Sequence, residues 1–218
     1  SLTMRHSVFT TMLWVIILTL FGCVGIKNQE ATGQPPGSGK KMIYRDAMDA
    51  WTQEGRIYDG VITRLISNVT FKSAAFRQAY TEEYSRLYNL AGVEYDNLVM
   101  QEQKEAADYH DFFMAAYVPE KKWDDFSKET SMWKIYITRD HVEQIRPLEI
   151  RRLKKKDPKI DYFYPYISTW KSIYHIRFPG IDPKTGNQIM GDPYDAFTLV
   201  MTSVIGSVEF KWEINQKQ

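Results

Sequence analysis

The hydrophobic pattern divides the chain into three parts that predict different structures. An apolar run from Val8 to Phe21 comes first, and a polar segment rich in Gly and Pro follows it up to Lys41. Aromatic and aliphatic residues at regular spacings begin only after that segment. Because periodic apolar positions are the signal of packed helices and strands, we expect the globular fold to lie within residues 42–218.

Several short segments alternate between apolar and polar positions, which is typical of antiparallel strands with one buried face. We expect Trp133, Ile135 and Ile137 to face inward, and likewise the apolar positions of the last strand, Val208, Phe210, Trp212 and Ile214. The expected strands are 56–71, 109–118, 133–138, 145–153, 171–179, 196–202 and 207–214. The first of them is long, and Gly60 is a candidate for a β-bulge within it.

Helical spacing is found before and after the first long strand. Residues 42–55 fit a short helix. A helical hairpin is expected at about 73–107, with Ser73 as the N-cap of its first helix and Gly92 at the end of that helix.

Strands in this number, interrupted by one helical hairpin, favour a mainly β fold with inserted helices. We interpret it as an immunoglobulin-like β-sandwich, by strand count, with the hairpin after the first long strand. The alternative is an α+β protein whose two small subdomains meet near Ala107.

The N-terminal apolar run carries a targeting signal. It follows the basic residue Arg5 and is shorter than the roughly 20 residues that span a bilayer. These features predict a secretory signal peptide. The sequence Leu20-Phe21-Gly22-Cys23 resembles the lipobox of bacterial lipoproteins. The resemblance implies that residues 1–22 are removed and that Cys23 is lipidated and becomes the first residue.

The polar segment 23–41 is then a flexible tether between the lipid and the domain, because it lacks the apolar residues needed to form a core. The resemblance places the protein in the bacterial cell envelope, anchored to the membrane by its lipid. In that family a residue other than Asp after the cysteine accompanies sorting to the outer membrane. Val24 fits this pattern, so the resemblance implies a domain that faces the periplasm or the cell surface.

The charge balance excludes nucleic acid as the main partner. Removal of residues 1–22 takes away one basic residue and no acid, which leaves 27 of each, whereas phosphate binding requires a basic excess. Cys23 is the only cysteine, so no disulfide can form within the chain. His110, His141 and His175 lack the spacing of a metal site, and we expect neither a metal nor a cofactor.

Two adjoining segments are candidates for a binding surface. One is a concentration of cations that could contact anionic lipid or an envelope protein; the other is a dense aromatic run that could form an interface. The alternatives are a solvated turn for the first and core packing for the second. The candidate residues are Arg151, Arg152, Lys154, Lys155, Lys156, Tyr162, Tyr164, Tyr166 and Trp170.

Together these features predict a non-catalytic binding or structural module, with no catalytic residues. A small-molecule or lipid carrier is the alternative, and it would need an apolar pocket between hairpin and sheet. An enzyme is a third possibility that would need His110 or His175 in a cleft beside an acid and a hydroxyl. We expect His175 to be exposed on its strand.

Overall fold

The computed structural model describes residues 38–139, 143–154, 157–191 and 196–214, with side chains from Ile43 onward. The helices in this part of the chain are α2 (Ser38–Trp51), α3 (Ala74–Tyr88), α4 (Val93–Asp108), the short 3-10 helix η1 (Lys121–Trp123) and α5 (Pro158–Phe163). The strands are β1 (Thr52–Asp59), β2 (Ile62–Phe71), β3 (Tyr109–Tyr117), β4 (Lys134–Thr138), β5 (Glu149–Arg152), β6 (Ser172–Pro179), β7 (Ala196–Ser203) and β8 (Gly206–Glu213). None of the described helices is both long and apolar enough to cross a membrane.

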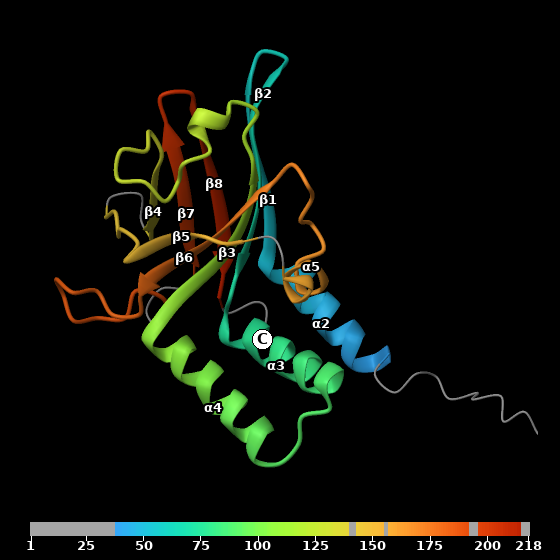
Figure 1. Cartoon of the computed structure of the whole chain (residues 1–218). Coiled ribbons are helices and arrows are strands. Elements are labelled where there is room, and N and C mark those ends of the chain that lie inside the picture. The colour runs from blue at the N-terminus through green and yellow to red at the C-terminus, as the bar shows by residue number, and fades with distance from the viewer. Residues whose placement is uncertain (1–37, 140–142, 155–156, 192–195, 215–218) are drawn as a thin grey trace, which may run out of the picture. The chain divides into compact units, whose positions relative to one another are not determined.

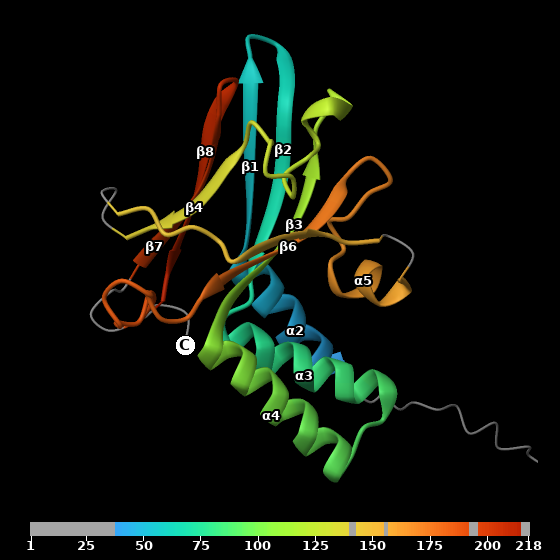
Figure 2. The same cartoon turned by 60° about the vertical axis from the view of Figure 1, so that its left-hand side comes forward.

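The strands form two antiparallel sheets (Figures 1 and 2). The larger sheet has the order β1-β2-β3-β6-β5, and the smaller has the order β4-β7-β8. The expectation of a mainly β fold with inserted helices is confirmed. The described residues fall into one compact unit that does not divide near Ala107, so the alternative of two subdomains is not supported.

The segment 56–71, expected as one long strand, contains a hairpin turn. Asp59 of β1 pairs with Ile62 of β2, so Gly60 and Val61 form a two-residue loop. Gly60 has a φ of +61°, the sign that the first position of a type I′ or II′ hairpin turn needs. The expectation of a single strand with a bulge at Gly60 was therefore wrong. Apolar residues on both sides of the turn made the two strands look continuous in the sequence.

The start of the fold also differs from the expectation. Helix α2 begins at Ser38, so residues 38–41, assigned to the tether by composition, are helical. It ends at Trp51 rather than at Gly55, because residues 52–55 pair with β2. Residues 1–37, which include the predicted signal peptide and Cys23, lie outside the described part of the chain.

The helical hairpin is confirmed as α3 and α4. The Ser73 side chain caps α3 by accepting a hydrogen bond from the Phe76 N–H. Gly92 does not end α3, as had been expected. Asn89 does so in the left-handed conformation, with φ of 51°, and Gly92 instead precedes the first turn of α4.

Aromatic side chains of the two sheets pack against one another. Phe71 of β2 and Phe112 of β3 contact Phe197 of β7 and Trp212 of β8, with ring centroids 5.0–6.2 Å apart. All four are buried, and burial of each such side chain contributes roughly 1.5–3 kcal/mol. The inward positions expected in residues 133–138 and 207–214 are confirmed for Trp133, which precedes β4, and for Ile135, Ile137, Phe210 and Trp212, all of which are buried. Val208 and Ile214 are only partly buried.

The other face of the larger sheet carries helices. Phe113 of β3 stacks on Tyr164, which follows α5, with ring centroids 3.7 Å apart. The Tyr44 hydroxyl of α2 donates a hydrogen bond to the Phe163 carbonyl at 2.6 Å. Helix α2 packs against α3, and α3 packs against α4. The hairpin is thereby held beside the sheet face that carries Phe113.

Candidate functional site

Register places charged side chains in neighbouring positions on the helix-facing side of the larger sheet. Because side chains alternate along a strand, Asp111 and Phe113 of β3 share this face, while Phe112 faces the smaller sheet. The pairing of β3 with β6, and of β6 with β5, extends these two positions into two rows. The rows are Asp111–Arg177–Glu149 and Phe113–His175–Arg151.

Asp111 is the centre of a buried charge cluster. Its carboxylate accepts hydrogen bonds from Arg77 Nη2 at 2.6 Å and from Arg177 Nε at 2.8 Å, and it lies 3.2 Å from His175 Nε2. Burial alone would raise the pKa of Asp111, but the hydrogen bonds from His175 and Arg177 and the charge of Arg77 hold it well below its ordinary value. Asp111 is therefore a permanent anion that holds three nitrogen-containing side chains in place.

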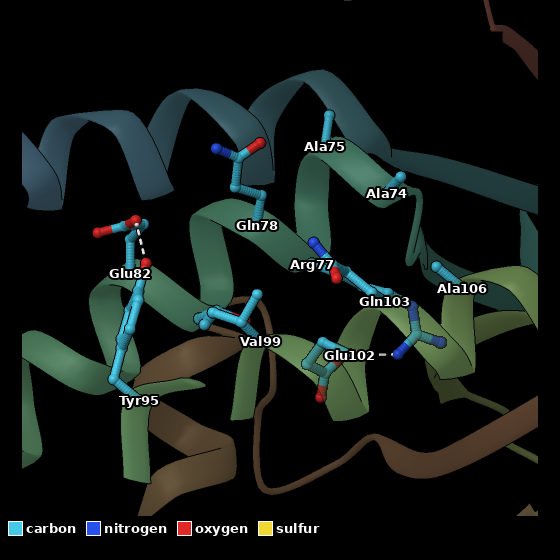
Figure 3. A pocket seen from close by; sticks show the side chains of 11 residues that line it. Ala74, Ala75, Arg77, Gln78, Glu82, Tyr95, Val99, Glu102, Gln103 and Ala106 are labelled. Carbon is cyan, nitrogen blue, oxygen red and sulfur yellow. Dashed lines mark hydrogen bonds and ion pairs between the residues drawn. The ribbon is translucent and has the colours of Figure 1, made fainter. Parts of the chain in front are cut away.

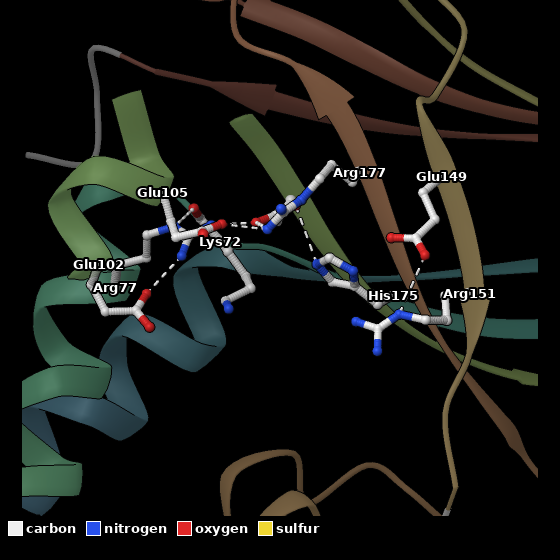
Figure 4. Close-up of polar contacts among 9 residues, drawn as sticks. Lys72, Arg77, Glu102, Glu105, Glu149, Arg151, His175 and Arg177 are labelled. Carbon is white, nitrogen blue, oxygen red and sulfur yellow. Dashed lines mark hydrogen bonds and ion pairs between the residues drawn. The ribbon is translucent and has the colours of Figure 1, made fainter. Parts of the chain in front are cut away.

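Both arginines of the cluster also bind acids of α4. Arg77 Nη1 donates to Glu102 at 2.6 Å, and Arg177 Nη2 donates to Glu105. The same two cations thus join the helical hairpin to the sheet (Figure 4). This arrangement fixes the width of the space between α4 and the strands.

A cleft of about 350 Å³ lies over this cluster, between α3, α4, α5 and the strands. It adjoins a hollow of about 380 Å³ with an aromatic lining, and Lys72, Glu102, Ile160 and Tyr164 belong to both. We call the two together the hairpin cleft. Its charged half is lined by Arg77, Glu105, Asp111, Arg151, His175 and Arg177. Its aromatic half is lined by Tyr80, Tyr84, Leu98 and Phe163, with Asp157 and Lys159 also present.

Lys72 brings a charge into the hairpin cleft that none of the described side chains pairs. None of the ion pairs and hydrogen bonds of the described residues involves its ammonium group, which lies 6.0 Å from the centroid of the Tyr80 ring. Burial lowers the pKa of Lys72, and the charge of Arg77 lowers it further, while Glu102 acts in the opposite direction. A cation held in this way favours the approach of an anion.

Two further polar groups of the hairpin cleft lack partners among the described residues. His175 Nδ1 is buried without a hydrogen bond. The Tyr164 hydroxyl takes part in none of the hydrogen bonds of the described residues, although its ring is buried. Buried polar groups are normally satisfied, so His175 Nδ1 marks a position where a ligand or water could bind.

A larger hollow of about 570 Å³ lies between α3 and α4 (Figure 3). Its charged side chains are all paired within the described part of the chain. The Tyr95 hydroxyl donates to Glu82 at 2.9 Å, and Arg77 donates to Glu102. The pair of Arg77 and Glu102 separates this hollow from the hairpin cleft. The hairpin cleft is the better candidate for a ligand site, because it contains polar groups without partners among the described residues.

The cationic segment predicted as a binding surface is divided between two faces. Arg151 lines the hairpin cleft. Arg152 points the other way and donates to Asp124 and to Ser172 Oγ. Lys154 is exposed, and Lys155 and Lys156 lie outside the described residues. Strand alternation in β5 is the reason that neighbouring cations separate.

The aromatic segment is likewise divided. Tyr164 is buried against Phe113, and Tyr166 shares a hydrogen bond of 2.6 Å with Thr70. Tyr162 is partly exposed, with its hydroxyl on Glu83, and Trp170 is 71% exposed. Core packing therefore accounts for Tyr164, whereas Trp170 is surface.

His175 was expected to be exposed, and this was wrong, because only 13% of its side chain is accessible beside Asp111. His110 neighbours Asp111 in sequence but points to the opposite face, where its ring lies 6.2 Å from that of Phe71. The cluster could have been recognised from Asp111 and Arg177, which interrupt apolar strands with opposite charges. Sequence alone does not reveal that β3 and β6 are neighbours.

In the described part of the chain, no three His, Cys, Asp or Glu side chains are grouped in a way that could hold a metal ion. Comparisons with protein-family models, curated proteins and solved structures found no match to this chain. Its function is therefore inferred from the hairpin cleft.

Proposed function

We propose that this protein is a non-catalytic binding module of the bacterial envelope and that the hairpin cleft is its ligand site. The observation that carries the proposal is the Lys72 ammonium, which lies in the hairpin cleft without an anionic partner among the described residues. Lys72 is only partly buried, so its ammonium can be reached from the cleft. An anion entering the cleft would meet a positive charge that no described side chain pairs, which favours binding of an anionic ligand there.

The chemistry of the lining favours binding over catalysis. Asp111 is held by Arg77, Arg177 and His175, and its depressed pKa makes it a poor proton acceptor. The described residues that line the hairpin cleft include no Ser, Thr or Cys to act as a nucleophile. A ligand would be held there by charge and aromatic contact.

The experiment that tests the proposal is native mass spectrometry of the chain purified from its own envelope. We expect a bound small molecule on the wild type. Gln101 and Gln103 are both exposed on α4, but Gln101 lines the hairpin cleft and Gln103 lines the hollow between α3 and α4. Gln101→Trp should remove the bound molecule, and Gln103→Trp should retain it. No bound molecule on the wild type, or equal effects of both variants, would contradict the proposal.

A lipid anchor on Cys23 would hold this module in the envelope, at the outer membrane, facing the periplasm or the cell surface. The lipobox resemblance of residues 20–23 supports this proposal. Mass spectrometry of the wild type should find acyl chains on an N-terminal Cys23, and Cys23→Ala should lack them. An unmodified wild-type chain would refute the anchor.

A small-molecule or lipid carrier is the second candidate, and the aromatic half of the hairpin cleft favours it. Tyr80, Tyr84 and Leu98 supply apolar contact area there. A carrier would exchange its ligand with membrane vesicles, whereas a module that only senses or retains a ligand would not. Transfer of the bound molecule from the purified chain to vesicles distinguishes the two.

An anionic lipid or an envelope protein is the proposed partner of the exposed cations. Arg152 and the exposed Trp170 line a shallow hollow on the same surface, and Lys154 is exposed nearby in sequence. Replacing Arg152 and Lys154 with Gln should weaken binding to anionic vesicles. Unchanged binding would show that these cations do not contact the lipid.

The finer description of the fold is also a proposal. We propose that the two sheets form a β-sandwich, immunoglobulin-like in its number of strands. The ring contacts of Phe71 and Phe112 with Phe197 and Trp212 support it. An experimental structure in which Phe197 and Trp212 of the smaller sheet do not contact Phe71 and Phe112 would refute it.

A further inference from the structure

We infer that the ligand of the hairpin cleft is an amphipathic organic anion, with its acidic group between Lys72 and Arg151 and its apolar body against the aromatic half. This inference rests on the proposed function, to which it adds a chemical class. It is carried by the position of two cations at one end of a cleft whose other end is lined mainly by aromatic and aliphatic side chains, together with the exposed Asp157 and Lys159.

Of the cations that line the charged half, Lys72 and Arg151 are available to bind a ligand. Arg77 and Arg177 are bound to Asp111 and to acids of α4. Among the described residues, Arg151 makes only a loose ion pair, with Glu149 at 3.5 Å, and the two side chains are 58% and 50% exposed. Pairs of this kind contribute little, so Arg151 can turn to an anion at small cost.

Lys72 and Arg151 reach the charged half from opposite sides. Lys72 comes from the segment that joins β2 to α3, and Arg151 comes from β5. Figure 4 shows both side chains directed into the same open space, with His175 between them. An acidic group in this space would meet an ammonium on one side and a guanidinium on the other, which can bind a carboxylate with two parallel hydrogen bonds.

The aromatic half is suited to an apolar body. The Tyr80 ring packs against Phe163 with centroids 4.6 Å apart, and the Tyr84 ring lies 6.1 Å from that of Phe163. These contacts hold the rings in fixed positions, with Leu98 and Ile160 also lining the space. Since Lys72 lies 6.0 Å from the Tyr80 ring, the acidic group and the apolar body would adjoin each other at Lys72.

Isothermal titration calorimetry of the full chain in lipid nanodiscs tests this inference with three probes. Phenylbutyrate has an acidic group and an apolar body, phenylbutanol has the same body without the charge, and inorganic phosphate has the charge alone. We expect phenylbutyrate to bind at least about tenfold more tightly than either of the others, since a hydrogen bond to a charged group is worth about a factor of ten or more.

Variants locate the acidic group. Lys72→Gln and Arg151→Gln should each weaken phenylbutyrate binding about tenfold, and Lys72→Arg should retain it. Lys104→Gln, on the exposed side of α4 and away from the cleft lining, is the matched control and should have no effect. Unchanged affinity in Lys72→Gln would overturn the position of the acidic group.

The probes also separate this inference from the proposed function. Equal binding of phenylbutanol and phenylbutyrate, or a neutral molecule bound to the chain purified from the envelope, would overturn the anionic class and leave the binding module standing. Equal binding of phosphate would overturn the apolar body. Failure of all three probes, with no bound molecule on the purified chain, would overturn both proposals.

Discussion

Arg77 Nη2 of α3 lies 2.6 Å from Asp111 Oδ2 of β3, and only 3% and 1% of the two side chains are exposed. This contact joins the helical hairpin to the larger sheet at the base of the hairpin cleft. We expect the Asp111 carboxylate to be important for stability, because its removal would leave the charges of Arg77 and Arg177 only partly compensated.

Asp111→Asn should lower the free energy of unfolding by about 3–5 kcal/mol, which is the range for breaking a buried ion pair by removing one partner. Urea unfolding followed by tryptophan fluorescence measures it. Glu149→Gln, at the exposed end of the same row of side chains, is the control and should change stability by less than about 1 kcal/mol. Equal effects of the two variants would show that the cluster does not hold the fold.

His110 should make the protein sensitive to mild acid. Burial lowers the pKa of its imidazole to about 4, although the charge of Asp111 acts in the opposite direction. An unfolded histidine titrates near pH 6.5, so the unfolded chain binds the proton first as the pH falls. Stability that is fully present above about pH 6.5 is therefore lost as the pH falls toward 4, by up to ~3 kcal/mol.

Urea unfolding at a series of pH values measures this loss, and His110→Gln should flatten the curve between about pH 6.5 and 4. Asp111 contributes in a different window. Its folded pKa is depressed, so its stabilisation is present above about pH 4 and is lost only at lower pH. Identical curves for wild type and His110→Gln would contradict the assignment.

Tyr164 and Trp170 should respond differently to truncation, although both belong to the aromatic segment. Tyr164→Ala removes a buried ring stacked on Phe113 and should cost about 3–5 kcal/mol. Trp170→Ala, at an exposed position, should change stability by less than about 0.5 kcal/mol. Thermal unfolding of both variants checks this, and a large loss for Trp170→Ala would show that its side chain is packed in the folded protein rather than exposed.

A substitution at Gly55 tests how closely β1 of the larger sheet packs against β8 of the smaller sheet. A Cβ at this position would lie 2.4 Å from Val208 Cγ2 and 2.7 Å from the Phe210 ring. Gly55→Ala should therefore destabilise the protein by about 1–3 kcal/mol through overpacking. Ser207→Ala, on the exposed side of β8, is the control. Unchanged stability of Gly55→Ala in denaturant unfolding would show that β1 and β8 do not pack in this way.

Local patterns along the chain were enough to predict most of the elements. The alternation around Trp212 identified β8 and its buried face, and Ser73 identified the start of α3. The errors arose where local signals were ambiguous. Asp59-Gly60 is a turn between two apolar stretches that look continuous, and Asn89 ended α3 because it could adopt a left-handed conformation before Gly92 was reached.

The hairpin cleft could not be predicted in the same way, because its residues come from distant parts of the chain. Lys72, Asp111 and His175 are brought together by the pairing of β2 with β3 and of β3 with β6. Each residue alone is unremarkable in a strand or beside one. The clue was the presence of charged residues at inward positions, which becomes meaningful only once the neighbouring strands are known.

The hairpin of α3 and α4 leaves the larger sheet at Lys72 and returns to it at Tyr109, and the Lys72 N–H donates to the carbonyl of Asp111, two residues into β3, at 2.9 Å. The two ends of the helical hairpin therefore lie next to each other, and the hairpin connects two adjacent, paired strands. Insertions, deletions or substitutions within it would reshape one wall of the cleft without disturbing strand register. Evolution could accordingly diversify what this scaffold recognises while leaving its sheets unchanged.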